Sequence, residues 1–331
     1  MLKIHFSPDD ILRTRVAPSA DPLWELVLSV HALQIRSRDP LTSDWRRGVS
    51  GELRRHVNKE QLRLLFAVNP SRGYFPDFLT PHDSVQGLEA GLEAVRSTPV
   101  PSLRRDLTRV VVAHPLPSSA AALARGEAET LCHLTDSMEQ YRMLALSPYW
   151  PHVQAAVEAD RTHRARAMLD RGVEGLLASL RPLARWDSGV LEIRGYPDSR
   201  ELHLDGRGLL LVPSFFCAGT PVALLDPALQ PVLVYPVDRL GGLAPTPGEG
   251  GATGDAREAL AALLGRTRAS VLEATYEGRT TGEVARRLRI SPAAASQHAT
   301  VLRKAGLLVS HRDRNTVLHT LTPLGRAILN T

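Results

Sequence analysis

The spacing of apolar residues predicts helices over most of the first half of the chain, about 19–182. Asp21 followed by Pro22 is a helix start signal, because the carboxylate can cap free N–H groups and proline fits the first turn. Apolar positions recur at helical intervals in 84–96, 125–146 and 152–180. The centre of the last segment, 158–166, is highly charged, so we expect it to be exposed or to span two domains.

A different pattern covers residues from about 187 to 240. Short β-rich runs are separated there by turn sequences such as 196–199 and 205–208. Residues 4–6 share this pattern and are expected to join the same sheet. The front of the chain is therefore predicted to be an α+β domain, mainly helical with an antiparallel sheet. The five expected later strands are 190–194, 201–204, 208–212, 221–225 and 231–235.

Residues 241–254 mark the clearest boundary, because they hold six glycines, two prolines and few apolar side chains. We expect a sensor or assembly domain over 1–240, a linker over 241–254 and a winged helix-turn-helix domain over 255–331. No run of 18 apolar residues occurs, so no membrane helix is expected. The opening residues do not resemble a signal peptide, which makes the expected location cytoplasmic.

Two short helices and a hairpin follow one another in the C-terminal domain. Thr280 or Thr281 can cap the first helix. Ser291 and Pro292 start the second, over 292–305, and Gly306 stands where a left-handed cap residue is needed. The predicted buried stripe of the second helix is Ala295, Ala299 and Leu302.

The opposite face of the second helix carries short or polar side chains. A helix that enters a major groove about 12 Å wide needs such a face, where serine and glutamine bond base edges and methyl groups contact thymine. Strand patterns at 307–311 and 316–321 then flank a basic turn at 312–315, which suits a wing on phosphates or in the minor groove. The candidate DNA contacts are Thr281, Ser291, Pro292, Ala293, Ser296, Gln297, Thr300, Arg303, Arg312, Arg314 and Asn315.

Positive charge is concentrated in the same domain. Residues 255–331 hold 12 Arg and Lys against 6 Asp and Glu, whereas the rest of the chain holds 28 against 29. A local basic excess is typical of a module that binds phosphates. Double-stranded DNA is therefore the expected partner of the C-terminal domain, and not of the front domain.

Residues 257–329 resemble the ArsR family of winged-helix transcriptional regulators. The resemblance rests on 263–268 with 271–272, on 281–285 and above all on 291–299. The family pattern Ser-x-x-x-Val-Ser-x-His-Leu has alanine here at Ala295 and Ala299. The resemblance implies that Pro292, Ala293, Ser296 and Gln297 face the bases, and that flanking helices form a homodimer.

The metal-sensing members of that family carry cysteines on the first helix of the motif or Asp/His pairs on the last. Residues 281–289 hold no cysteine, and residues 323–330 hold no Asp, Glu or His. The resemblance therefore carries over no metal site. The opening segments 4–6, 9–17 and 21–25 resemble longer ArsR-like regulators with an N-terminal domain of unknown function, which implies no ligand.

Candidate chemistry in the front domain is sparse. Cys132 and His133 are adjacent on an expected helix and point about 100° apart, so they do not easily share a metal. Cys217 is interpreted as a core residue, although a nucleophilic thiol stays open for both cysteines. The aromatic clusters at 74–78, 149–150 and 215–216 line either a pocket or the core. No phosphate loop or hydrolase motif occurs, and we expect no catalytic, cofactor or metal residues.

Together these features predict a dimeric, sequence-specific DNA-binding transcriptional regulator that acts as a repressor. The recognition helix 292–305 enters the major groove, and the wing 307–321 lies on the backbone or in the minor groove. The front domain is expected to sense an unidentified small-molecule effector or to mediate assembly. Two alternatives stay open: an enzyme or protein-interaction module in the front domain with the winged helix as a targeting element, and a winged helix that binds protein.

Overall fold

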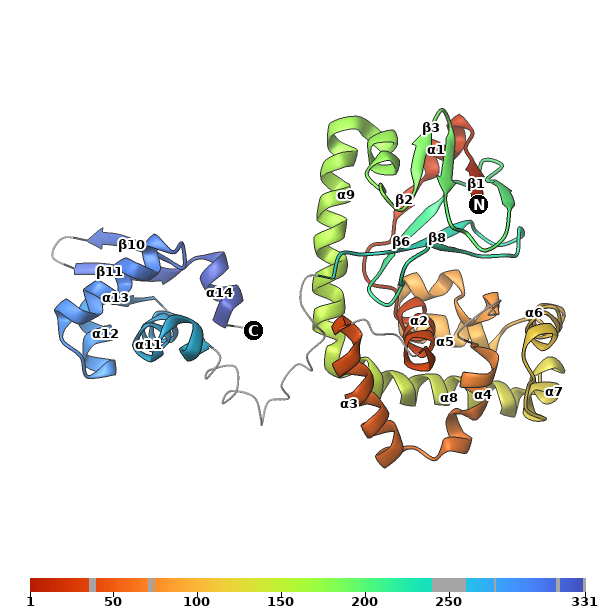
Figure 1. Cartoon of the computed structure of the whole chain (residues 1–331), viewed down its shortest axis with the longest axis horizontal. Coiled ribbons are helices and arrows are strands. Elements are labelled where there is room, and N and C mark those ends of the chain that lie inside the picture. Colours follow the sequence, from red (N-terminus) through yellow and green to blue (C-terminus); the bar gives the residue numbers. More distant parts are fainter. Residues whose placement is uncertain are drawn as a thin grey trace. The chain divides into compact units, whose positions relative to one another are not determined.

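The computed structural model describes residues 1–35, 40–70, 74, 76–239, 260–276, 278–313 and 316–329. It divides into two units, Met1–Thr246 and Pro247–Thr331 (Figure 1). The α+β fold class is confirmed, with helices and sheets in both units. The predicted linker 241–254 lies outside the described residues, so the three-part division stays a prediction. No helix among the described residues is long and apolar enough to cross a membrane.

The front unit begins with a short strand–helix–strand segment and continues as a helical layer. The segment is β1 (Leu2–His5), α1 (Pro8–Arg13) and β2 (Arg15–Val16). The helices that follow are α2 (Pro22–Gln34), α3 (Pro40–His56), α4 (Lys59–Val68), α5 (Leu88–Arg96), α6 (Val100–Ala113), α7 (Ser119–Ala124) and α8 (Ala128–Ala145). Short 3-10 turns lie between them at η1 (Asp77–Leu79), η2 (His82–Gln86) and η3 (Ser147–Tyr149).

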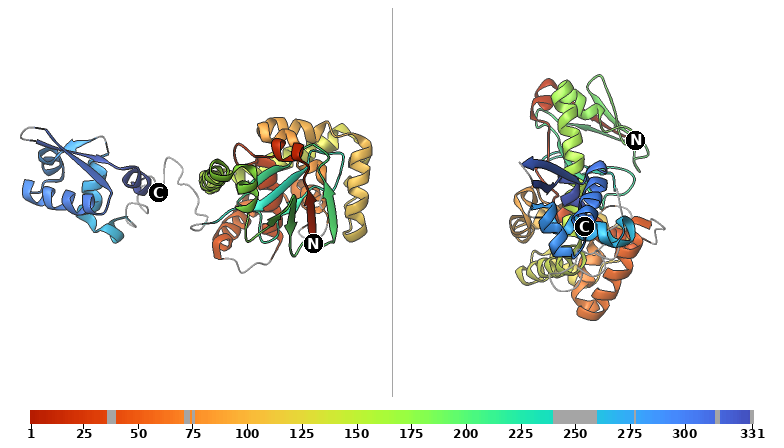
Figure 2. Two further views of the ribbon diagram at one scale, coloured as in Figure 1. Left: turned by 90° about the horizontal axis from the view of Figure 1, so that it is seen from above. Right: turned by 90° about the vertical axis from the view of Figure 1, so that its left-hand side faces the viewer.

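The long helix α9 (Trp150–Ala178) leads from these helices to the remaining strands. Those strands are β3 (Arg185–Asp187), β4 (Val190–Ile193), β5 (Arg200–His203), β6 (Leu210–Ser214), β7 (Val222–Ala223) and β8 (Val232–Pro236). They form two four-stranded sheets with the orders β3-β4-β1-β5 and β2-β6-β8-β7. As predicted, the N-terminal strand joins the later sheet, and Figure 2 shows β1 beside the green strands.

The prediction of a wholly antiparallel sheet is wrong for three strand pairs. β1 runs antiparallel to β4 but parallel to β5, and β6 runs parallel to both β2 and β8. The alternation of apolar residues predicts where strands lie but not which strands pair. Here β1, from the N-terminal end of the unit, lies between β4 and β5. The strands β4 and β5, which follow one another in the sequence, therefore do not pair as a hairpin.

The sheet β2-β6-β8-β7 is covered on both faces. Leu210 and Val212 of β6 belong to the core cluster of the helical layer, whereas Leu209 and Leu211 belong to a second cluster shared with the sheet β3-β4-β1-β5. All five residues of β6 are buried, as expected of a strand without a solvent face. The front unit is therefore built in three layers: sheet, sheet and helices.

Helix α9 contributes to both core clusters. Val153 and Val157 pack among the helices, and Leu176 and Leu177 pack against the sheets. Figure 1 shows the helix running beside both layers. Its polypeptide leaves helical geometry at Arg171 and at Gly172, whose φ of 65° favours glycine.

The expectation that the charged centre of α9 is exposed is wrong for two residues. The side chains of Arg164 and Asp160 are 9% and 8% exposed and form an ion pair of 2.8 Å. Tyr235 of β8 donates a hydrogen bond of 2.6 Å to Asp160, and Arg164 donates to the carbonyl oxygen of Ser179. Their charges are compensated inside the structure, so these two side chains face the sheet. The other charged residues of the centre agree better with the expectation, since Glu158, His163 and Arg166 are exposed.

A buried carboxylate joins α2 to the end of β6. Asp21 caps α2 as predicted, accepting from the N–H groups of Leu23 and Trp24. One turn later, Glu25 is completely buried and accepts from the N–H groups of Phe215 and Phe216 at 2.7 and 2.9 Å. The hydroxyl of Ser214 donates a third bond at 3.0 Å. Burial raises the pKa of Glu25 to about 7, and the two backbone bonds oppose that shift.

The predicted elements of the C-terminal unit occur in the predicted order, and one short strand that was not predicted, β9 (Arg279–Thr280), joins them. It contains α11 (Arg266–Ala274), β9 (Arg279–Thr280), α12 (Thr281–Leu288), α13 (Pro292–Lys304), β10 (Leu308–Asp313), β11 (Thr316–Leu321) and α14 (Pro323–Leu329). The strands form an antiparallel sheet in the order β10-β11-β9. An aliphatic cluster fills the centre, and the predicted stripe of Ala295, Ala299 and Leu302 lies in it. Gly306 has the predicted left-handed conformation, with a φ of 74°.

Candidate functional site

Helix α13 begins at the predicted cap. The hydroxyl oxygen of Ser291 accepts from the N–H of Ala294 at 3.1 Å, and Pro292 occupies the first turn. Ser291, Pro292 and Ala293 are all exposed. The start of the helix therefore presents its first turn to solvent while the Ser291 cap fixes where the helix begins.

The outward face of α13 agrees with the predicted helix phase. Ser296, Gln297 and Arg303 are exposed, and Thr300 is half-buried. Ala295, Ala299 and Leu302, on the opposite face, are at most 2% exposed. This arrangement leaves a ridge of small and polar side chains able to approach another surface closely. No structural observation tests whether these residues contact DNA, so the predicted contacts stay predictions.

Thr281 is engaged inside the unit. Its hydroxyl forms a 2.9 Å hydrogen bond with Nε2 of His319, and Nδ1 of that ring bonds the hydroxyl of Ser310 at 2.8 Å. His319 is 5% exposed, and burial, aided by the positive charge of Arg303, lowers its pKa. The ring thus connects the start of α12 to both wing strands. His319 was not among the predicted functional residues, because a strand pattern shows which residues alternate but not which side chains bond to each other.

The wing consists of two strands paired over six residues each. Arg312 and Asp313, predicted to lie in the turn, belong instead to β10 and pair with Val317 and Thr316. The predicted strand ended too early, because Arg312 and Asp313 are both polar and break the apolar–polar alternation on which the prediction relied. The side chain of Arg312 and the whole of Arg314 and Asn315 lie outside the described residues.

Basic side chains dominate the surface of the two motif helices. Residues 281–304 contain Arg286, Arg287, Arg289, Arg303 and Lys304, all exposed, and a single acidic residue, Glu283. Glu283 is used locally: it accepts from the N–H of Thr280 at 2.8 Å in a capping box. The net charge of this surface is therefore positive, which favours a polyanion as partner.

A comparison with family models agrees with this geometry. Residues 263–311 match the model described as a helix-turn-helix domain. The match covers α11, α12, α13 and most of β10, and it indicates DNA binding for the C-terminal unit. Neither a curated protein nor a solved structure was found to match the chain.

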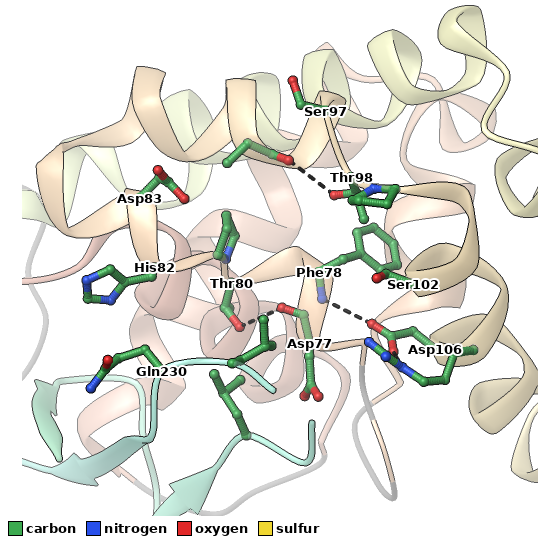
Figure 3. A pocket seen from close by; sticks show the side chains of 16 residues that line it. Asp77, Phe78, Thr80, His82, Asp83, Ser97, Thr98, Ser102, Asp106 and Gln230 are labelled. Carbon is green, nitrogen blue, oxygen red and sulfur yellow. Dashed lines mark hydrogen bonds and ion pairs between the residues drawn. The ribbon is translucent and has the colours of Figure 1, made fainter. Parts of the chain in front are cut away.

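The front unit contains a cavity of about 240 Å³ beside η1, η2, α5 and α6 (Figure 3). Its lining includes the apolar side chains of Phe78, Leu224 and Leu229. Polar side chains also line it, namely Asp77, Thr80, His82, Asp83, Ser97, Thr98, Ser102, Arg105, Asp106 and Gln230. A cavity of this size and mixed lining fits a small polar molecule.

Two buried carboxylates beside the cavity hold backbone segments in place. Asp77 accepts from the N–H groups of Leu225 and Asp226 at 3.2 and 2.9 Å. Asp106 accepts from the N–H of Phe78 at 3.2 Å, as Figure 3 shows. Burial, and to a lesser extent the nearby charge of Asp106, raises the pKa of Asp77 to about 6. Both groups are thus satisfied by the fold itself.

The cysteines differ in environment. Cys217 is buried, and burial beside Glu25 raises the pKa of its thiol to about 12, which disfavours the reactive thiolate. Cys132 is exposed on α8. Of the aromatic clusters, Phe78, Tyr149, Phe215 and Phe216 all belong to the core of the helical layer, and Phe78 also lines the cavity.

Proposed function

We propose that the protein is a sequence-specific DNA-binding transcriptional regulator. Helix α13 carries this proposal. One face is a buried stripe of alanine and leucine, and the opposite face is an exposed ridge of small and polar residues. α13 inserts into the major groove, where Ser296 and Gln297 bond base edges and Ala293 and Thr300 contact thymine methyl groups. The wing 307–321 follows the backbone or the minor groove.

The regulator acts as a homodimeric repressor. The likeness of 257–329 to the ArsR family supports repression and a dimer built from the flanking helices. Two apolar side chains on those helices support a contact: Leu263 is 76% exposed and Leu324 of α14 is 54% exposed. A dimer also reads twice as many base pairs as a monomer, and a single half-site rarely contains enough base pairs for specific binding.

The front unit supplies the input. Its cavity has the size and polarity for a small-molecule effector, whose binding would change the affinity for DNA. An enzyme in this unit is the second candidate, favoured by the paired carboxylates Asp77 and Asp106. Because both carboxylates already accept backbone hydrogen bonds, we assign them to structure and propose no catalytic activity.

A nuclease footprint of the full chain on the region upstream of its own coding sequence tests the proposed function. We expect one protected stretch with two half-sites, about 10 base pairs apart from centre to centre or a multiple of that spacing. Uniform or absent protection at low salt would contradict the proposal. An effector could release the protein from the DNA. The footprint is therefore repeated on dialysed protein, first without and then with a small-molecule extract.

A further inference from the structure

The solvent face of the sheet β3-β4-β1-β5 holds a cluster of metal-binding side chains. His5 of β1 is in register with His203 of the parallel strand β5, and Glu201 lies two residues before His203. All three side chains therefore point to the same face. Their neighbours Leu2, Ile4 and Leu202 point to the opposite face and are buried. The alternation that builds the core thus brings these three donors together.

The donor atoms are close to one another. One ligand atom from each residue lies within 4.8 Å of the other two. His5 Nε2 is 3.5 Å from Glu201 Oε2, and the His5 and His203 rings stack with centroids 4.5 Å apart and planes inclined by 10°. Apart from this approach to Glu201, the buried Nε2 of His5 has no hydrogen-bond partner among the described residues. An unsatisfied buried nitrogen costs free energy, which a coordinated ion would recover.

Two imidazoles and a carboxylate suit zinc and similar divalent transition metals, with bonds of about 2.0–2.2 Å. Stacked rings direct their nitrogens in parallel, so one ring must turn before both bind one ion. The His203 side chain is exposed and that of Glu201 is 60% exposed, which leaves both room to turn. His5 is the more restricted donor, with a side chain 31% exposed.

The charges around the cluster balance. Lys3 lies in register with Glu201 on one side and with Glu192 of β4 on the other. The positive charge of Lys3 beside a ligating carboxylate disfavours cation binding, but the negative charge of Glu192 offsets it. Without an ion, the same residues form an ordinary row of cross-strand pairs on a solvated face.

We propose that His5, Glu201 and His203 bind one divalent transition-metal ion, with water completing the coordination. The ion would join the N-terminal strand to the edge strand β5, and the site is independent of DNA binding. No metal site was expected from the sequence, because the ligands lie at opposite ends of the front unit and only the insertion of β1 next to β5 brings them together.

Equilibrium dialysis of the full chain against Zn²⁺ tests the site, with Cys132→Ser as the parent to remove the exposed thiol. We expect the parent to bind one ion per chain. His203→Ala and Glu201→Gln should each weaken this binding by about tenfold or more. The matched control is His163→Ala, an exposed histidine on α9, which should bind as the parent does.

A second readout follows Co²⁺ by its visible absorption. The parent should give the intense bands of low-coordinate cobalt, and His203→Ala should lose them. Far-UV circular dichroism confirms folding, which is expected because both substituted side chains are exposed. Equal binding by His203→Ala and His163→Ala, or no binding by the parent, would overturn the proposal.

Discussion

The front unit encloses carboxylates in its core, whereas the described part of the C-terminal unit is held by a small aliphatic cluster. Asp10, Asp21, Glu25, Asp77 and Asp106 are all at most 4% exposed. In the described C-terminal residues the buried polar side chains are Thr275 and His319. The front unit therefore depends on hydrogen bonds between segments far apart in sequence, and the C-terminal unit on local apolar packing.

This difference separates two tasks. The C-terminal unit presents a capped helix with an exposed face of small and polar side chains, which suits a surface that reads another molecule. The front unit contains groups that titrate near neutral pH and a polar cavity, so its stability is expected to respond to the chemical environment. All four tryptophans, Trp24, Trp45, Trp150 and Trp186, lie in the front unit, so their fluorescence reports that unit alone.

The largest effect is expected from Glu25→Ala. The change leaves two N–H groups and the Ser214 hydroxyl without their acceptor. Each orphaned buried group costs about 1–3 kcal/mol, so we expect the front unit to lose about 4 kcal/mol. Urea unfolding followed by tryptophan fluorescence measures this loss. The control is Glu174→Ala, which changes an exposed glutamate on α9. If both variants lose the same small amount of unfolding free energy, Glu25 is not a structural acceptor.

A core truncation should destabilise the other unit instead. Leu302→Ala removes a side chain that is 1% exposed from the aliphatic cluster, and we expect a loss of about 3 kcal/mol. The loss should be seen by far-UV circular dichroism, while the tryptophan transition stays unchanged. A shift of the tryptophan transition by the same amount would mean that the two units unfold together and that the contrast drawn between them is wrong.

The stability of the front unit should depend on pH through Glu25. Because the folded pKa of Glu25 is raised from 4.5 to about 7, the native state holds the proton more tightly than the unfolded state. The stability from this group is complete below about pH 4.5 and is lost as pH rises through about 7. We expect wild type to lose stability relative to Glu25→Gln across this window.

The comparison with Glu25→Gln removes the contributions of other groups. Asp77, whose pKa burial raises to about 6, shifts stability in the same direction, and His31, whose pKa burial lowers to about 4, shifts it in the opposite direction. Both are present in wild type and variant. Parallel stability curves for the two proteins would rule out Glu25 as the titrating group.

The smallest effect on stability, with a large effect on recognition, is expected at the exposed face of α13. The double change Ser296→Ala and Gln297→Ala should alter stability by no more than about 0.5 kcal/mol. The difference in binding free energy between the correct and an incorrect base pair should fall by about 1–3 kcal/mol for each base pair that loses its contact. Gln154→Ala, on the exposed side of α9, is the control and should leave discrimination unchanged. Unfolding of the double variant would place this face in the core.

Local signals account for what could be predicted. The caps at Asp21, Ser291 and Gly306 and the stripe through Ala295 each depend on a few neighbouring residues, and the structure has them as predicted. Partners far apart in sequence could not be predicted. The parallel pairing of β1 with β5 and the acceptor role of Glu25 both join segments about 200 residues apart, and no local pattern encodes such a pairing.

The central claim is that the C-terminal unit reads duplex DNA by sequence. Fluorescence anisotropy of the full chain on a duplex containing the footprinted site, and on a shuffled duplex of equal composition, tests it directly across a range of salt concentrations. We predict that the footprinted duplex binds at least about 1000-fold tighter at physiological salt. The logarithm of the affinity should fall linearly with the logarithm of the salt concentration, with a slope reduced by about 1 in Arg303→Ala. Equal affinity for both duplexes, or binding that salt does not weaken, would contradict the claim.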